Sequence, residues 1–104
     1  MGLLVADDNN FEDQLTGKKV IVKYYADWCG SCRLFAPKFK RLSNDEKYSG
    51  ITFLDVNAES NPESRKKGAV KNLPSFAIFD DGKFVGSICT SKEEALVEFL
   101  EKAK

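Results

Sequence analysis

Apolar and polar positions follow two different periods along the chain, and the period indicates the type of element. A nearly continuous run of β-branched and aromatic residues over 19–26 predicts a central strand that is covered on both faces. Further apolar runs predict shorter strands at 3–5, 51–56, 76–79 and 83–89. Asp81-Gly82 separates the last two runs and is typical of a tight two-residue hairpin. The pattern therefore predicts five strands, of which the last two are antiparallel.

Apolar residues at helical spacing predict four helices between and after these strands. Their expected ranges are 11–15, 32–42, 62–67 and a last helix, ending near 103, that a capping box at 91–94 opens. We expect Asn9 or Asn10 to cap the first helix. Ser60 or Asn61 is expected to cap the third. Pro37 lies inside the second helix, where it removes one backbone hydrogen bond and predicts a kink.

The order of the elements is βαβαβα followed by ββα, and this order predicts the architecture. Alternating strands and helices imply a parallel core with right-handed crossovers, and the closing hairpin adds antiparallel strands. A chain of 104 residues is long enough to bury a single core but not two. We therefore expect one α/β domain over residues 1–104, with a central mixed sheet and helices on both of its faces.

Composition and charge exclude several classes of function. With 42% hydrophobic and 31% charged residues the chain is an ordinary globular protein. Sixteen basic and sixteen acidic residues cancel, and the longest basic run, 65–67, is typical of a solvated helix end rather than of a nucleic-acid site. No stretch approaches the roughly 18–20 apolar residues of a membrane span. We expect no signal peptide, because residues 1–7 have no basic region and too short an apolar run. We expect a cytoplasmic protein that binds neither nucleic acid nor membranes.

The candidate chemistry lies in the hexapeptide Trp28-Cys29-Gly30-Ser31-Cys32-Arg33, between the central strand and the second helix. Two thiols at this spacing can close a disulfide with little backbone movement. The free N–H groups and the dipole of the helix N-terminus would favour a thiolate on Cys29, which makes it a nucleophile. The alternative is half of a zinc site, but zinc needs four ligands, and the chain has no histidine and one further cysteine, Cys89. Redox chemistry without a metal is the favoured interpretation.

A second motif, Leu73-Pro74-Ser75, and the order of the elements complete a resemblance to the thioredoxin family over essentially the whole chain. Residues 24–33 resemble the segment aromatic-x-Ala-x-Trp-Cys-Gly-Pro-Cys-Lys of that family. Pro37 falls at its helix-kinking proline, and Pro74 matches its cis-proline signature. The resemblance implies the thioredoxin fold and a protein disulfide reductase with a CGSC active site.

The resemblance also implies a role for each residue of the two motifs. Cys29 would be the exposed attacking thiolate and Cys32 the more buried resolving thiol. Trp28 would shield the site and offer a flat face to a substrate backbone, although it is also compatible with a core aromatic. Pro74, if cis, would lie against the disulfide and leave the Leu73 backbone free to pair with an extended substrate. The alternative for Pro74 is a proline that begins a strand.

Ser31 departs from the family pattern, which has a proline between the cysteines. Serine frees a backbone N–H and adds a hydroxyl that could donate a hydrogen bond to a Cys29 thiolate. Since about 30 mV corresponds to roughly 1.4 kcal/mol for this couple, such small effects change the reduction potential measurably. We expect the potential to be less reducing than that of a typical thioredoxin.

Lys23 is the second departure, because the family usually has a buried acid six residues before its first cysteine. Asp55 lies on the next strand, at a position where some relatives carry a lysine, so the two charges look exchanged. A buried lysine without a carboxylate partner would have a strongly lowered pKa. We therefore predict a Lys23–Asp55 pair beneath Cys32 that relays protons through water. In the alternative, Lys23 extends to the surface and Asp55 is solvated.

The last two candidate residues in the sequence are Cys89 and Thr90. Thr90 stands where the family usually has a glycine that lines the substrate groove. We expect Cys89 to be buried and to behave as a small hydrophobe, and the alternative is a third redox thiol.

The function expected from these residues is reduction of protein disulfides by dithiol–disulfide exchange. The electron donor would be an enzyme of the thioredoxin reductase type, and the chain itself would bind no cofactor, since it contains no GxGxxG or phosphate loop. Two alternatives stay open: a binding or chaperone-like module with this fold, and a dedicated redox partner of one protein. We expect a monomer.

Overall fold

The computed structural model describes residues 2–103, which form one sheet and its surrounding helices. In chain order the elements are β1 Leu3–Val5, α1 Phe11–Leu15, β2 Lys19–Tyr25, α2 Gly30–Ser43, a 3₁₀ turn Glu46–Tyr48, β3 Thr52–Asn57, α3 Pro62–Lys67, β4 Ser75–Asp80, β5 Lys83–Cys89 and α4 Glu93–Ala103. The sequence pattern predicted this order, apart from the 3₁₀ turn. Among the described residues no helix is long and apolar enough to cross a membrane.

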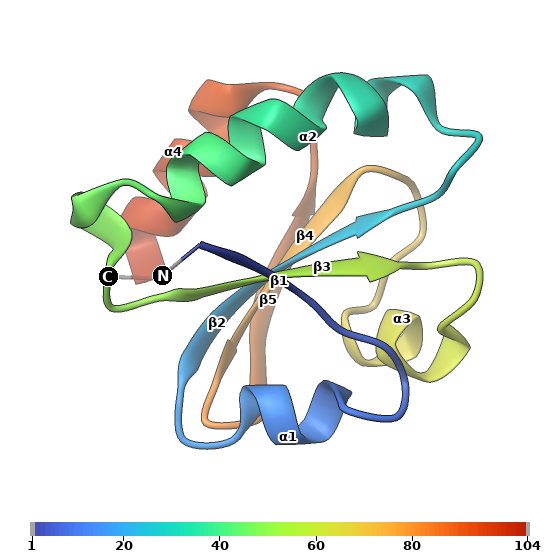
Figure 1. The fold of residues 1–104 in the computed structure, drawn as a ribbon, viewed down its shortest axis with the longest axis horizontal. Coiled ribbons are helices and arrows are strands. Elements are labelled where there is room, and N and C mark those ends of the chain that lie inside the picture. The colour runs from blue at the N-terminus through green and yellow to red at the C-terminus, as the bar shows by residue number, and fades with distance from the viewer. Residues whose placement is uncertain (1, 104) are drawn as a thin grey trace.

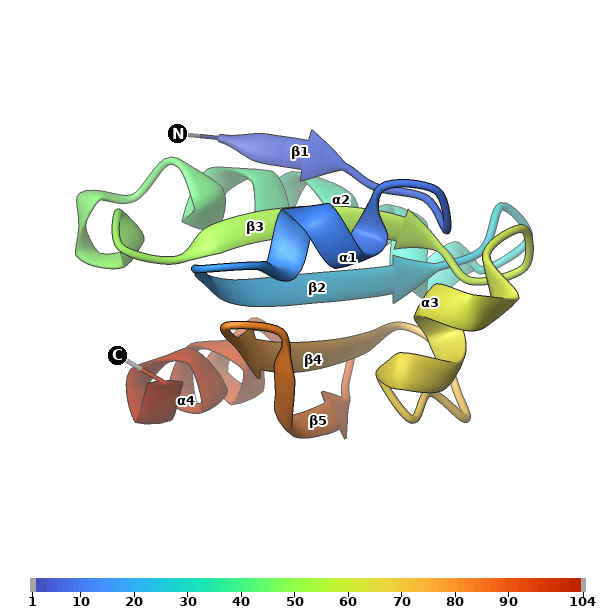
Figure 2. The same ribbon diagram turned by 90° about the horizontal axis from the view of Figure 1, so that it is seen from below.

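The sheet is mixed and has the strand order β1-β3-β2-β4-β5. β1, β3 and β2 are parallel, whereas β4 and β5 are antiparallel to their neighbours. Helices α2 and α4 cover one face and α1 and α3 cover the other, as Figure 1 shows, while Figure 2 shows the strands side by side. The predicted α/β fold class is therefore confirmed.

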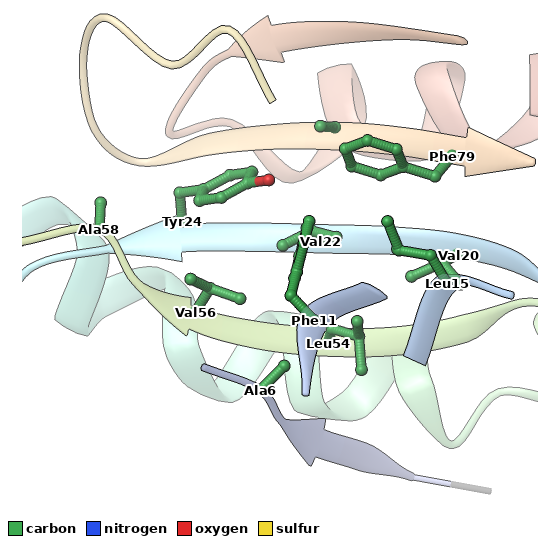
Figure 3. Close-up of a cluster of buried hydrophobic side chains, with 11 residues drawn as sticks. Ala6, Phe11, Leu15, Val20, Val22, Tyr24, Leu54, Val56, Ala58 and Phe79 are labelled. Atoms are coloured by element: carbon green, nitrogen blue, oxygen red, sulfur yellow. The ribbon is translucent and has the colours of Figure 1, made fainter. Parts of the chain in front are cut away.

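Two hydrophobic clusters lie on opposite faces of the sheet. The cluster on the α1/α3 side, shown in Figure 3, contains Ala6, Phe11, Leu15, Val20, Val22, Tyr24, Leu54, Val56, Ala58, Ala77 and Phe79. The cluster on the α2/α4 side contains Ile21, Phe35, Phe39, Leu42, Tyr48, Phe53, Phe76, Ile78, Leu96 and Leu100. Because side chains alternate along a strand, β2 supplies both clusters, and Lys23 follows Ile21 onto the α2/α4 side.

The hairpin between β4 and β5 forms where the sequence predicted it. Asp81 and Gly82 have φ angles of 50° and 83°, the positive values that a type I′ turn requires at both central positions. The Asp81 carboxylate also accepts a hydrogen bond of 2.6 Å from the backbone N–H of Gly17. The turn is thereby held against the end of α1.

The helix boundaries differ from the sequence expectation at their N-termini. α2 begins two residues early, at Gly30, because the Cys29 sulfur accepts a hydrogen bond of 3.2 Å from the N–H of Cys32 and so caps the helix. Asn10 stands at the N-cap of α1, but its side chain accepts from Asp7 N–H, before the helix. Asn61 likewise stands at the N-cap of α3 without a side-chain cap bond. The expectation that these asparagine side chains cap their helices was wrong.

Candidate active site

The cysteine pair lies where β2 ends and α2 begins, at the end of the sheet where the loop from α3 to β4 also lies (Figure 1). A turn closed by a 3.1 Å hydrogen bond from Cys29 N–H to Ala26 C=O leads from the strand into the helix. Cys29 and Cys32 are joined in a disulfide with their Cα atoms 5.2 Å apart. Residues with i, i+3 spacing in the first turn of a helix face one another, which brings the two sulfurs together.

Both cysteines are buried in this oxidised state. Cys29 is 5% exposed and Cys32 is 2% exposed. Cys32 is the more buried of the two, as expected, but the expectation of an exposed Cys29 was wrong. The side chains of Leu73 and Tyr25 pack against the two cysteines and Ala26 and exclude solvent from them. Cys29 is therefore reachable only through the small part of its surface that stays exposed.

Trp28 is an exposed aromatic, with 67% of its surface accessible, so the interpretation as a core residue was wrong. Leu34, on α2, is another exposed large apolar side chain close to the cysteine pair in sequence. Sequence reasoning missed Leu34, although its position outside the apolar stripe of α2 was a usable signal. Exposed apolar surface beside a reactive group is typical of a site that contacts other proteins.

The Leu73–Pro74 peptide bond is cis, as the resemblance implies. Pro74 is buried, and the partly buried Leu73 packs against the cysteine pair. Strand β4 begins directly after Pro74, and the Ser75 hydroxyl donates a hydrogen bond of 3.1 Å to the C=O of Ile88. This bond ties the start of β4 to β5 beside the cis peptide.

Cys89 is exposed, which corrects the expectation that it is buried. β5 is an edge strand whose burial alternates, and Gly86 and Ile88 are the residues that face the protein. Cys89 faces the other way, opposite Ser75 in the strand register. Thr90 follows it as a half-buried residue, and its Oγ1 accepts a hydrogen bond of 3.1 Å from Lys92 N–H.

Lys23 and Asp55 are neighbours across β2 and β3, and Lys23 Nζ lies 3.2 Å from Asp55 Oδ1. They form the ion pair that the exchanged charges suggested. The Lys23 side chain is 2% exposed and that of Asp55 is 18% exposed, so neither the surface lysine nor the solvated aspartate of the alternative is present. The ammonium also lies 5.5 Å from the ring centroids of Tyr25 and Phe39, at the distance of a cation–π contact.

A cavity of about 420 Å³ lies between this ion pair and Cys32. Its lining residues are Lys23, Tyr25, Ala26, Asp27, Cys32, Arg33, Ala36 and Asp55. Burial raises the pKa of Asp55 and the nearby Lys23 ammonium partly opposes the shift, so that the net pKa is above its usual range. The buried Oδ1 of Asp55 has no well-aligned hydrogen-bond donor among residues 2–103, which makes its contact with Lys23 an ion pair alone. A cavity lined in part by charged side chains can hold water.

Ser31 and Gly30 form the exposed rim of the disulfide. The Ser31 hydroxyl lies 3.5 Å from the Cys29 sulfur, within reach of a hydrogen bond to it. Arg33 donates a hydrogen bond of 3.2 Å from Nη1 to the C=O of Asp27, which places its positive charge beside the cavity. Among residues 2–103, no three His, Cys, Asp or Glu side chains lie close enough together to hold a metal ion.

The fold and this site define a class of protein: an α/β protein with a CxxC disulfide at the start of a helix and a cis-proline beside it. The sequence model of the family described as Thioredoxin matches residues 2–102. The chain therefore belongs to the thioredoxin family.

Curated relatives fall into two groups. Thioredoxin F1, chloroplastic, of Arabidopsis thaliana is 37% identical over 89 residues, which is 84% of this chain but 48% of that protein. The thioredoxin of Staphylococcus saprophyticus is 31% identical over 104 residues and 98% of both chains. The chain thus spans about half the length of the f-type relatives and nearly the whole of the bacterial one.

Solved structures give the same result. A chain in the crystal structure of a complex of ferredoxin:thioredoxin reductase and thioredoxin f2 superposes with a TM-score of 0.88 at 30% identity, over 98% of this chain and 94% of that chain. Chlamydomonas reinhardtii thioredoxin f2 superposes with a TM-score of 0.86 at 29% identity, over 99% and 97% of the two chains.

Proposed function

We propose that the chain is a thiol–disulfide oxidoreductase that reduces disulfides in other proteins. The observation that carries this proposal is the Cys29–Cys32 disulfide at the N-terminus of α2, with the cis Leu73–Pro74 bond beside it. Membership of the thioredoxin family supports the same activity. The chain binds no cofactor in this proposal, because the reactive groups are its own two sulfurs.

The reaction starts from the reduced pair and transfers two electrons. The Cys29 thiolate attacks one sulfur of the substrate disulfide, a bond forms between them, and the other substrate sulfur leaves as a thiolate. Cys32, once deprotonated, attacks Cys29 and forms the internal disulfide, which releases the second substrate thiol. The substrate disulfide is thereby reduced and the pair oxidised.

The start of α2 stabilises the attacking thiolate in this scheme. The N–H of Cys32, at 3.2 Å, already donates to the Cys29 sulfur, and the positive end of the helix dipole favours a negative charge there. The Ser31 hydroxyl, at 3.5 Å, is placed to add a second donor. Because a hydrogen bond to a charged thiolate is stronger than one to a disulfide sulfur, these donors favour the dithiol form, which supports a potential less reducing than that of a typical thioredoxin.

The substrate groove in this proposal consists of Trp28, Leu73, Pro74 and Thr90. The exposed Trp28 ring offers an apolar face. The Leu73 backbone would pair with an extended segment of substrate. Thr90 narrows the groove compared with the glycine that the family usually has. Backbone pairing explains how one groove accepts many protein sequences.

The Lys23–Asp55 pair would supply the proton acceptor for the resolving step. Cys32 must lose a proton before it attacks, and it shares a cavity with both charges. Lys23 carries no lone pair when protonated, so Asp55 is the base, and water in the cavity would carry the proton to it. If Lys23→Met left the pH dependence of disulfide reduction unchanged, the relay would be contradicted.

The electron donor in this proposal is an enzyme of the reductase type. One structural neighbour comes from a complex with ferredoxin:thioredoxin reductase, which supports such a partner without identifying it. A monomer suits this exchange, because both partners must reach the same opening. The proposed compartment of the protein is the cytoplasm.

The test is the reduction potential of the Cys29–Cys32 couple against glutathione, measured together with insulin reduction. A potential some tens of millivolts above the roughly −270 mV typical of thioredoxin, with rapid turnover of insulin, would support the proposal in full. No turnover of insulin would contradict it and favour a binding module. Binding of a partner by a chain in which both cysteines are replaced by serine would then identify that module.

A further inference from the structure

A carboxylate from a distant part of the chain caps the first turn of α3. Asp8 lies in the connection from β1 to α1, and its Oδ1 accepts hydrogen bonds from the N–H of Ser64 at 2.8 Å and from the Ser64 hydroxyl at 2.7 Å. Its Oδ2 accepts from the N–H of Glu63 at 3.2 Å. The N–H of Asp8 in turn donates to Asn61 Oδ1 at 2.8 Å. We refer to these four residues, Asp8, Asn61, Glu63 and Ser64, as the Asp8 clamp.

α3 depends on this clamp because it cannot cap itself. It has only six residues, and helices of this length are not stable without tertiary contacts. The side chain of Asn61, at its N-cap, donates instead to the C=O of Asn57 at 2.9 Å. The N–H groups of the first turn therefore find their acceptor in Asp8.

A continuous set of contacts leads from the clamp to the disulfide. The Tyr24 hydroxyl donates to the C=O of Ser64 at 2.9 Å, which joins α3 to the sheet. Arg65 and Val70 exchange two hydrogen bonds of 3.4 Å, from Arg65 Nε to the Val70 C=O and from the Val70 N–H to the Arg65 C=O. Three residues further on, Leu73 packs against the cysteine pair and precedes the cis-proline. The position of the Leu73 backbone thus follows from the position of α3.

We infer that Asp8 is a positioning residue for the substrate groove: through α3 it holds the Leu73 backbone where a protein substrate pairs with it. The inference rests on the proposed function. None of the hydrogen bonds of the Asp8 clamp involves Cys29 or Cys32, so the clamp acts on substrate binding and leaves the chemistry of the sulfurs unchanged. A small disulfide that needs only the Cys29 sulfur is therefore insensitive to the clamp.

The experiment compares Asp8→Ala and Ser64→Ala with wild type in reduction of insulin and of the small disulfide DTNB. We expect KM for insulin to rise about fivefold in each variant, which corresponds to ~1 kcal/mol. The kcat for insulin, the DTNB rate and the reduction potential should stay at the wild-type values. The double variant should show no rise beyond that of Asp8→Ala, since the hydroxyl bond that Ser64→Ala removes is one of the three that Asp8→Ala removes. Asp8→Asn keeps one acceptor oxygen and should give an intermediate KM.

Asp13→Ala is the matched control, because it removes an exposed carboxylate from α1 and should leave KM unchanged. An unchanged KM in both clamp variants of an active protein overturns the inference, and so does an equal loss with insulin and DTNB. A wild-type chain that reduces neither disulfide contradicts the proposed function itself, which is a different result.

Discussion

Asp55 and Asp8 lie on opposite faces of the sheet and differ in what their carboxylates meet. Asp55 lies on the α2/α4 side and faces a cavity, where burial raises its pKa despite the ammonium of Lys23. Asp8 lies on the α1/α3 side. Burial raises its pKa too, but hydrogen bonds from Ser64 and Glu63 lower it by more, and the net pKa is below the usual range. The surroundings of Asp55 therefore disfavour its charged form, whereas the surroundings of Asp8 stabilise its charged form.

The difference distinguishes Asp55, for which we propose a chemical role, from Asp8, which stabilises the fold. A buried ion pair contributes little net stability, because removing two charges from water offsets their attraction. The proton transfer that we propose for this pair, which lies beside Cys32, would explain why a pair of little net stability is present. The Asp8 clamp needs no such explanation, since it supplies hydrogen bonds that a short helix lacks.

The largest expected effect on this comparison comes from Lys23→Met. It leaves the Asp55 carboxylate largely buried and without its counter-charge, which should lower the free energy of unfolding by about 3–5 kcal/mol. Urea unfolding of the oxidised protein at neutral pH measures the change. The double variant Lys23→Met/Asp55→Leu removes both charges and should return within about 1–2 kcal/mol of wild type. Equal losses in the two variants would mean that Lys23 contributes by packing alone.

Gly68→Ala tests the other side of the sheet, where α3 meets Tyr24. A Cβ at this position would lie 2.5 Å from the Tyr24 hydroxyl oxygen, and Tyr24 is completely buried and cannot move away. We expect a loss of about 1–3 kcal/mol from overpacking. Gly86→Ala is the matched control, because nothing lies within 4 Å of its Cβ position. Similar thermal midpoints for the two variants would contradict this account.

Ser64→Ala tests the Asp8 clamp with a smaller expected effect. The buried hydroxyl donates to Asp8, and its removal should cost about 1 kcal/mol, since the half-buried carboxylate keeps its two backbone donors and can also turn to water. Denaturant unfolding provides the measurement. A loss as large as that of Lys23→Met would remove the contrast between the two sites.

The smallest effect is a difference in the pH dependence of stability. The pKa of Asp8 is lowered from 3.8, so its contribution is complete above pH 3.8 and is lost as the pH falls through the folded value. The pKa of Asp55 is raised from 3.8, so the folded state favours its protonated form, and stability is lost as the pH rises from 3.8 through the folded value.

Unfolding free energies of wild type, Asp8→Asn and Asp55→Asn, measured from about pH 3 to pH 7, should separate these two slopes. Replacing Asp8 should flatten the acid limb below pH 3.8, and replacing Asp55 should remove the loss above it. Curves that change in the same direction for both variants would show that the two carboxylates do not differ as described.

Local sequence signals predicted most of the fold. The apolar run and the Asp-Gly turn predicted β5 and its hairpin, because the residues that determine them are adjacent in the chain. The cap of α3 could not be predicted in this way, since Asp8 is 56 residues away from Ser64 and nothing in its neighbourhood marks it. The exposure of Cys89 depends on which strand ends at the sheet edge, which is also a tertiary property.

The candidate site likewise has features that local sequence signals predicted and features that depend on the tertiary structure. The hexapeptide and the Leu-Pro-Ser motif identified the cysteine pair and the cis-proline, and the exchanged charges suggested the Lys23–Asp55 pair. The cavity that these charges share with Cys32 could not be predicted, because its walls come from β2, β3 and α2 together.

The most direct measurement of the central claim is the trapping of a mixed disulfide. In a Cys89→Ser background, which removes the exposed third thiol, Cys32→Ser should form a stable mixed disulfide with insulin through Cys29, because no second thiol can resolve it. Cys29→Ser should form none. Mass spectrometry of the adduct identifies the sulfur. Trapping in Cys29→Ser through Cys32, or in neither variant, would contradict the account.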